Sequence, residues 1–145
     1  MVIIRKATEN DIPRILELYS ELAEEKINLS PAKAQRIFNE ISSMPNHEFF
    51  VGEQDNLVVG TVYLQIVPNL THDGKPWAII ENVVVDSRFR GKGIGHSLME
   101  AALACCRAAG CCRVQLLSNK KRVEAHKFYR SLQFEESALG FRLYL

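Results

Sequence analysis

The sequence lacks the features that mark several common classes of protein. Its longest apolar runs fall far short of the roughly 20 residues that a membrane-spanning helix needs. No charged N-terminal segment leads into a long apolar run, so no signal peptide is expected. The 18 basic and 17 acidic residues leave a net charge of +1, whereas a nucleic-acid-binding domain normally carries a basic excess. We therefore expect a cytoplasmic protein with neither a membrane nor a nucleic acid as its partner.

The cysteines lack the spacing of a common metal site. The chain has four cysteines, arranged as the adjacent pairs Cys105-Cys106 and Cys111-Cys112. Neither pair has the C-x-x-C spacing of a zinc site, and neighbouring side chains on a helix or strand point in different directions. We expect reduced, structural cysteines in a reducing compartment, and no metal site.

The length and the hydrophobic periodicity predict the fold class. A chain of 145 residues with 47% apolar and 24% charged residues fits one globular domain, 1–145, with a core of ordinary size. Helical spacing of apolar residues predicts helices over 12–22, 31–44, 93–109 and 121–132. Strand patterns cover 2–5, 49–53, 57–67, 77–85 and 113–117, with one or two further strands in 134–145. The order of these elements indicates an α+β domain with a mixed sheet.

A glycine-rich turn, residues 88–95, joins the apolar strand 77–85 to the helix that follows. Its alternating glycines let the backbone approach a ligand, so that successive N–H groups can bind an anion. The helix N-terminus adds free N–H groups and partial positive charge, and Arg88, Arg90 and Lys92 add mobile positive charge. The spacing matches neither a Walker loop nor a dinucleotide fingerprint. The turn therefore predicts a phosphate site of another kind.

Two motifs resemble those of the GNAT family of acyl-CoA N-acyltransferases. Arg88-Phe89-Arg90-Gly91-Lys92-Gly93 resembles the family signature Q/R-x-x-G-x-G/A, which holds the pyrophosphate of coenzyme A. Asn119 followed by A-x-x-F-Y at 125–129 resembles a later family motif. The resemblance implies the GNAT fold, a mixed, mostly antiparallel sheet of six or seven strands flanked by about four helices. One departure is Gln133, which stands where the family usually has a glycine before an aromatic residue.

The resemblance implies acetyl-CoA as co-substrate and assigns the residues that bind it. The backbone N–H groups of Val83 and Val85 would polarise the thioester carbonyl and bind the pantetheine arm as an added strand does. Asn119 would hold the pantetheine or the splayed strands, and Arg122 with its basic neighbours would attract the phosphates, unless these are only solvated turn charges. The expected coenzyme-binding residues are Val83, Val85, Arg88, Phe89, Arg90, Gly91, Lys92, Gly93, Ile94, Gly95, Asn119 and Arg122.

Glu81 is the candidate general base, acting directly or through a water. It is the one carboxylate within the apolar strand 77–85, where we expect burial to raise its pKa. In the family, a glutamate near this position often has that role. The alternative is a carboxylate that merely pairs with a buried cation or with the backbone.

Tyr129 is the candidate acid that protonates the departing thiolate. Its position in a helical stripe with Ala125, Phe128 and Leu132 also suits an ordinary core residue, and it is the resemblance that implies the catalytic role. His126 is interpreted as structural, and His47 and His72 remain unassigned.

The acceptor is expected to be the primary amine of a small molecule. The chain resembles aminoalkylphosphonate and glucosamine-phosphate N-acetyltransferases within the family, so an anionic amine contacted by Arg142 or Lys75 is the hypothesis. The alternatives are a protein N-terminal or lysine acetyltransferase, and a non-catalytic acyl-CoA-binding module. Exposed edge strands also suggest a possible homodimer.

Overall fold

The computed structural model describes residues 1–145, which divide into two compact units, 1–115 and 116–145. The first unit contains the sheet and three α-helices, and the second contains one further α-helix, α4 (Val123–Ser131). None of the helices has the length and apolar character required to span a membrane.

The sheet has five strands in the order β1-β2-β3-β4-β5. The first four strands pair antiparallel, and β5 runs parallel to β4. The turn between β2 and β3 is formed by Asp55 and Asn56, both at positive φ (53° and 62°), the conformation that favours a tight hairpin. This turn joins the two strands that the sequence predicts over 49–53 and 57–67. The strands are β1 (Ile3–Lys6), β2 (His47–Gln54), β3 (Leu57–Val67), β4 (Trp77–Val85) and β5 (Val114–Gln115).

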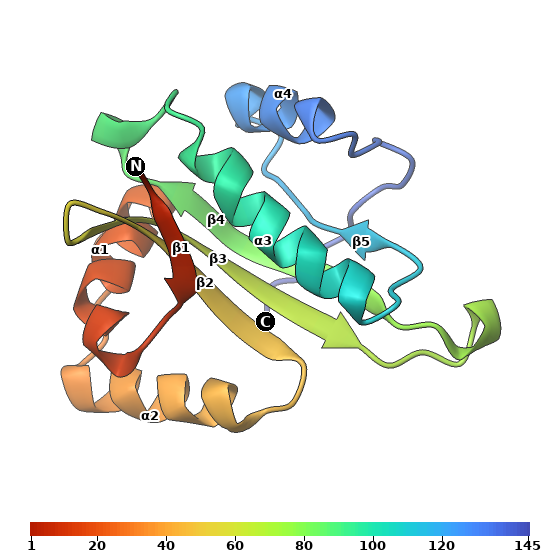
Figure 1. Ribbon diagram of the computed structural model, residues 1–145, viewed down its shortest axis with the longest axis horizontal. Coiled ribbons are helices and arrows are strands. Elements are labelled where there is room, and N and C mark those ends of the chain that lie inside the picture. Colours follow the sequence, from red (N-terminus) through yellow and green to blue (C-terminus); the bar gives the residue numbers. More distant parts are fainter. The chain divides into compact units, whose positions relative to one another are not determined.

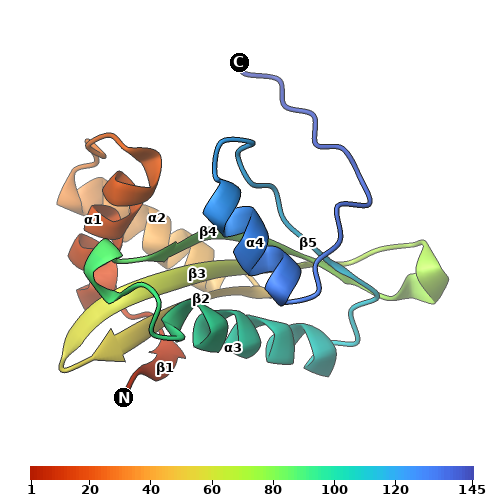
Figure 2. The same ribbon diagram turned by 90° about the horizontal axis from the view of Figure 1, so that it is seen from above.

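Helices cover both faces of the sheet in the first unit. Figure 2 shows α3 on one face and both α1 and α2 on the other. The second helix begins as predicted, because the Ser30 side chain accepts a hydrogen bond from the Lys33 N–H (3.2 Å) and Pro31 occupies the first turn. The helical elements of this unit are η1 (Glu9–Asp11), α1 (Ile12–Ala23), α2 (Pro31–Ser43), η2 (His72–Gly74), η3 (Ser87–Phe89) and α3 (Ile94–Ala108) (Figure 1).

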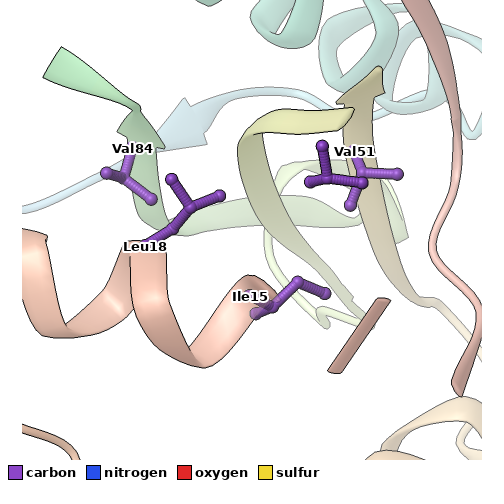
Figure 3. Packing of buried hydrophobic residues seen from close by; sticks show 5 residues of the cluster. Ile15, Leu18, Val51 and Val84 are labelled. Carbon is purple, nitrogen blue, oxygen red and sulfur yellow. The ribbon is translucent and has the colours of Figure 1, made fainter. Parts of the chain in front are cut away.

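The core between α1 and the sheet is built from branched aliphatic side chains. Ile15 and Leu18 of α1 pack toward Val51 of β2 and Val84 of β4 (Figure 3), and Val58 completes this cluster. Burying each of these side chains contributes roughly 1.5–3 kcal/mol. The cluster fixes α1 against β4 and so holds the C-terminal end of that strand in place.

The opposite face of the sheet lies close to α3, whose Leu98, Met99 and Ala102 are buried. Gly60 of β3 permits this approach. A Cβ atom at Gly60 would lie 2.9 Å from the Leu98 side chain and 3.0 Å from the Val84 carbonyl oxygen. The helix that follows the glycine-rich turn is therefore packed tightly against the sheet.

The sheet departs from the sequence-based prediction in its strand number. Residues 134–145 form no strand, so there are five strands and not the expected six or seven. The alternating apolar pattern of this segment is present, but a strand needs a paired edge as well as a pattern. The α+β class, the mixed and mostly antiparallel sheet and the four α-helices are confirmed.

Candidate functional site

The first feature of the site is an open edge on β4. Only Ala78 and Ile79 pair with β5, whereas β4 continues to Val85. The Asp86 N–H donates to the Val59 carbonyl of β3 (2.8 Å), and backbone groups alternate in direction along a strand. The N–H and C=O groups of Val83 and Val85 therefore face the side where β5 has ended. Such an edge can bind an extended ligand as an added strand.

A β-bulge lies immediately before this edge. Thr61 of β3 pairs with Val84, but Tyr63 pairs with Glu81, so Asn82 and Val83 together oppose a single residue. Asn82 adopts φ 53°, the left-handed conformation that asparagine tolerates better than most residues. A bulge bends the strand and changes the direction of the side chains beside it.

Glu81 is exposed, so the predicted burial of this carboxylate is wrong. The apolar character of β4 suggested cover on both faces. However, β5 ends opposite Ile79, and the part of β4 beyond that point has no neighbouring strand on that side. Glu81 and Asn82 are both accessible there, next to the bulge.

Asp86 organises the glycine-rich turn, although sequence reasoning gave it no role. Its carboxylate is 2% exposed and accepts hydrogen bonds from the Arg88 backbone N–H (2.9 Å), Nε (3.0 Å) and Nη2 (2.7 Å). The Arg14 guanidinium of α1 also donates to it. The bonded Arg88 guanidinium holds the pKa of the Asp86 carboxyl well below its usual range. Aspartate often accepts a hydrogen bond from the backbone N–H two residues later, so Asp86 is a signal in the sequence that could have predicted this turn.

Arg90 is also bound to protein acceptors. Its Nε donates to the Val85 carbonyl (3.0 Å) and its Nη2 to the Glu21 carboxylate of α1 (3.0 Å). Lys92 places its Nζ 5.0 Å from the centre of the Phe89 ring. Two of the three cations predicted to be mobile, Arg88 and Arg90, are therefore held on the turn by ion pairs.

The glycines of the turn lead into α3. Gly91 and Gly93 adopt φ 75° and 79°, and a Cβ atom on either residue would meet no protein atom within 4 Å. Gly93 is the N-cap of α3 and supplies no capping side chain. The first N–H groups of the helix, beginning at Ile94 and Gly95, have no partner within the helix. The N-terminus of α3 and the adjacent backbone of Gly91 and Gly93, which no side chain covers, can therefore bind an anion.

The second unit contains the other predicted residues. Tyr129 of α4 is buried, and its ring centre lies 5.4 Å from that of Phe128 and 6.0 Å from that of Phe134. The side chain of Asn119 accepts a hydrogen bond from the Lys121 N–H (3.0 Å). Asn119 therefore builds the turn that leads into α4.

Two contacts complete this turn. The Asn119 carbonyl accepts from the Arg122 N–H (3.0 Å) and from His126 Nε2 (2.8 Å). Arg122 is the N-cap of α4, and its side chain is exposed.

Gln133 forms the turn after α4 at the position where the family usually has a glycine. It adopts φ 67°, and the Phe134 N–H donates to the Tyr129 carbonyl (3.1 Å), closing the helix end. The sequence left the geometry of this turn open, and the structure shows a left-handed cap.

A polar cluster that the sequence did not reveal lies on the α1 and α2 face of the sheet. His47 Nδ1 is hydrogen-bonded to the Tyr63 hydroxyl, which also accepts from Gln65 Nε2 (3.0 Å). Burial raises the pKa of the Tyr19 hydroxyl on α1, and the nearby Asn82 side chain opposes this shift. These residues sit at regular strand and helix positions, so their periodicity resembles that of core residues.

A pocket of about 340 Å³ adjoins this cluster at the end of α2. His47 is one of its lining residues, together with Phe38 and Phe49. None of the predicted coenzyme-binding residues lines it. The pocket therefore lies apart from the glycine-rich turn.

Comparison with known proteins identifies the family. Residues 15–134 match the Acetyltransferase (GNAT) family. A glucosamine 6-phosphate N-acetyltransferase of Trypanosoma brucei brucei is 31% identical over 145 residues, covering 97% of this chain and 93% of the relative. An aminoalkylphosphonate N-acetyltransferase of Salmonella typhimurium is 28% identical over 139 residues, covering 95% of this chain and 88% of the relative.

Comparison with solved structures also identifies an acetyltransferase fold. A solved structure from Agrobacterium tumefaciens str. C58 matches with a TM-score of 0.93 and 34% identity, over 99% of both chains. The chain belongs to the GNAT family of acetyltransferases, whose members use acetyl-CoA as co-substrate.

Proposed function

We propose that the protein transfers the acetyl group of acetyl-CoA to the primary amine of a small molecule, by direct attack within a ternary complex. The observation that carries this proposal is the open edge of β4, which continues directly into a glycine-rich turn at the N-terminus of α3. One end of this arrangement suits an extended amide-bearing arm, and the other suits a pyrophosphate. Coenzyme A contains both groups.

The coenzyme would be bound mainly by backbone groups. Val83 and Val85 would pair with the pantetheine arm, and the N–H groups of residues 91–95 would bind the pyrophosphate. Arg88 and Arg90 are engaged with Asp86 and Glu21, so their main contribution would be to hold the turn in shape. Lys92, which makes no ion pair, is the better candidate for direct contact with a phosphate.

Glu81 would remove the proton from the attacking amine. An alkylamine with a pKa near 10.4 is only about one part in a thousand neutral at pH 7, so a base assists the reaction. The exposure of Glu81 is compatible with transfer through a water. Tyr129 would donate its hydroxyl proton to the coenzyme A thiolate as the C–S bond breaks.

The acceptor would be an amine that also carries a phosphate or phosphonate. Two relatives act, by their names, on glucosamine 6-phosphate and aminoalkylphosphonates. Arg142 or Lys75, both exposed, would contact the anion. The pocket at the end of α2 and the His47–Tyr63 pair lie on the same face of the sheet as Glu81, since Tyr63 pairs with Glu81 in the register. We assign this face to the acceptor.

The test is incubation of the purified protein with acetyl-CoA and a panel of aminophosphonates, amino sugar phosphates, polyamines and short peptides, with products read by mass. We expect acetylation of an anionic small amine. Glu81→Gln should lower kcat by about 10²-fold or more while acetyl-CoA binding is kept. Acetylated peptides alone would instead indicate a protein acetyltransferase. Tight acetyl-CoA binding without any product would support the binding-module alternative.

Arg142→Ala and Lys75→Ala separate the two candidates for the anion contact. Substitution of the residue that contacts the anion should raise the KM of the anionic acceptor about tenfold or more. The reason is that a charge-assisted hydrogen bond contributes roughly 1.5–3 kcal/mol. The KM of a neutral amine should stay the same. A KM unchanged in both variants would reject both assignments.

A further inference from the structure

The C-terminal end of α3 carries thiols that the proposed reaction does not use. Cys106 lies in the last turns of the helix and is buried, and Cys111 is half-buried on the chain that leads from α3 to β5 (Figure 1). All four cysteines of the chain are free. Consecutive side chains diverge in direction, so the two cysteines that can face each other here are not sequence neighbours.

The backbone at this helix end brings Cys106 and Cys111 together. The Cys111 N–H donates to the Cys106 carbonyl (3.0 Å), and the Gly110 N–H donates to the Arg107 carbonyl (3.0 Å). Gly110 adopts φ 73°, so the two bonds form a Schellman motif. The side chains at the two ends of the longer bond of this motif commonly contact each other. In this protein both of those side chains are thiols.

The two thiols share a hydrogen bond and differ in acidity. Burial raises the pKa of the Cys106 thiol to about 12, and the neighbouring Cys111 adds to this shift. Burial also raises the pKa of the Cys111 thiol, but the hydrogen bond from Cys106 opposes that shift. Cys106 therefore keeps its proton at neutral pH, and Cys111 is the more readily ionised of the two. A thiolate, not a thiol, is the attacking species in disulfide chemistry.

A covalent link at this position would join α3 to the start of β4. The residue after Cys111 is bound to the sheet, because the Cys112 N–H donates to the Pro76 carbonyl (2.8 Å). The Ala78 N–H of β4 in turn donates to the Arg113 carbonyl (3.0 Å). The connection between α3 and β5 is therefore already fixed at one end, and a disulfide would fix it at the other.

We propose that Cys106 and Cys111 form a redox-active dithiol, which a small disulfide oxidant converts to an intramolecular disulfide. The Cys111 thiolate attacks one sulfur of the oxidant, and the first thiol leaves with the proton that Cys111 has lost. Cys106 then attacks Cys111 Sγ in the mixed disulfide, and the second thiol leaves with the Cys106 proton. Two electrons and two protons thus pass from the dithiol to the oxidant. This proposal does not depend on the acetyl-transfer reaction.

The test equilibrates the full chain with oxidised glutathione in excess, blocks the remaining thiols by alkylation and maps disulfides by peptide mass. Trypsin cleaves after Arg107, so the expected disulfide joins two separate peptides within an intact mass of one chain. Dithiothreitol should reverse it. We expect the oxidised form to melt about 4 °C or more above the reduced form, because a disulfide constrains the unfolded chain.

Matched variants assign the cross-link to its cysteines. The double variant Cys105→Ser/Cys112→Ser keeps only the proposed pair and should retain both the cross-link and the higher melting temperature. Cys112 is exposed and Cys105 is only partly buried, so the fold should tolerate both changes, and circular dichroism checks this. Cys111→Ser should lose the cross-link and the rise in melting temperature.

Three results would overturn the proposal. The first is Cys106 that remains free for alkylation in the wild-type protein at every ratio of oxidised to reduced glutathione. The second is a cross-link that the double variant loses or that Cys111→Ser keeps, which would assign the disulfide to other cysteines. The third is a disulfide found only in species with the mass of two chains, which would make the bond intermolecular.

Discussion

The Asp86 carboxylate and Arg88 are joined by three hydrogen bonds, two from the guanidinium and one from the backbone N–H of Arg88. Arg88 is the first residue of the family signature, and its side chain here bonds back to Asp86, the residue that follows β4. The shape of the glycine-rich turn therefore depends on an aspartate that lies outside the signature.

The first prediction concerns this aspartate. Asp86→Asn keeps the size of the side chain but removes the charge that holds Arg88 and Arg14. We expect the free energy of unfolding to fall by about 2–4 kcal/mol, because both guanidinium groups lose a buried anionic partner. The dissociation constant of acetyl-CoA should rise about tenfold or more. Urea denaturation and calorimetric titration measure the two effects.

Glu17→Gln is the control for this variant. Glu17 pairs with the same Arg14 but is largely exposed, so its loss should change stability by less than about 1 kcal/mol. Acetyl-CoA binding by Asp86→Asn that equals the wild-type value would show that the turn keeps its shape without this contact.

The second prediction concerns stability in acid. Hydrogen bonds from Arg88 lower the pKa of Asp86, and those from Arg5 lower the pKa of Asp11. Because these folded-state values lie below the unfolded value of about 3.9, the unfolded chain binds more protons in acid. The stabilisation is therefore complete above about pH 4 and is lost as the pH falls through the folded-state values. Urea denaturation from neutral to acid pH should show this decline, with a smaller slope in Asp86→Asn; equal slopes would contradict it.

The third prediction uses the left-handed residue after α4. Gln133 adopts φ 67° and is exposed, and a residue with a side chain in this conformation costs roughly 1–2 kcal/mol. Gln133→Gly should relieve this strain, and the greater backbone entropy that glycine loses on folding offsets part of the gain. We therefore expect the free energy of unfolding to rise by about 0.5–1 kcal/mol. Gln133→Ala should bring no gain, because alanine keeps the strain. A Gly variant less stable than wild type would show that the Gln133 side chain makes a stabilising contact.

Local patterns explain the parts of the fold that the sequence predicted correctly. Asp55 and Asn56 encode the hairpin turn within two residues, and Gly91 and Gly93 encode the turn before α3 in the same way. In each case, the residues that determine the conformation are also the residues that adopt it. No knowledge of distant contacts was needed.

The incorrect predictions depend on pairing between distant segments. The exposure of Glu81 follows from the point where β5 ends, and β5 is only two residues long. The expected strands in 134–145 have the correct alternation, but the segment forms no strand. The Asp86–Arg14 pair joins residues 72 positions apart, so only the folded chain reveals it.

The fourth prediction concerns the approach of α3 to β3. Gly60→Ala would place a methyl group 2.9 Å from the Leu98 side chain and 3.0 Å from the Val84 carbonyl. The carbonyl belongs to a neighbouring strand and cannot move freely, so we expect a loss of about 1–3 kcal/mol in unfolding free energy. Gly52→Ala is the control, because its contacts of 3.2–3.4 Å involve only side-chain atoms. A loss no larger than that of the control would show that α3 shifts without cost.

The fifth prediction tests Tyr129 as the acid of the proposed reaction. Tyr129→Phe removes the hydroxyl but keeps the ring that packs near Phe128 and Phe134. We expect kcat to fall by about 10²-fold, the usual contribution of a positioned acid, while the dissociation constant of acetyl-CoA stays the same. Steady-state rates with products read by mass, and calorimetric titration of acetyl-CoA, measure the two quantities.

Phe128→Leu separates the hydroxyl from the packing around it. This change disturbs the same aromatic cluster and should lower the unfolding free energy by about 1–2 kcal/mol, but it leaves the Tyr129 hydroxyl in place. If packing alone governs turnover, Phe128→Leu and Tyr129→Phe will reduce kcat to a similar extent. If the hydroxyl donates the proton, only Tyr129→Phe will show the large loss. An unchanged kcat in Tyr129→Phe would assign protonation of the thiolate to another group or to solvent.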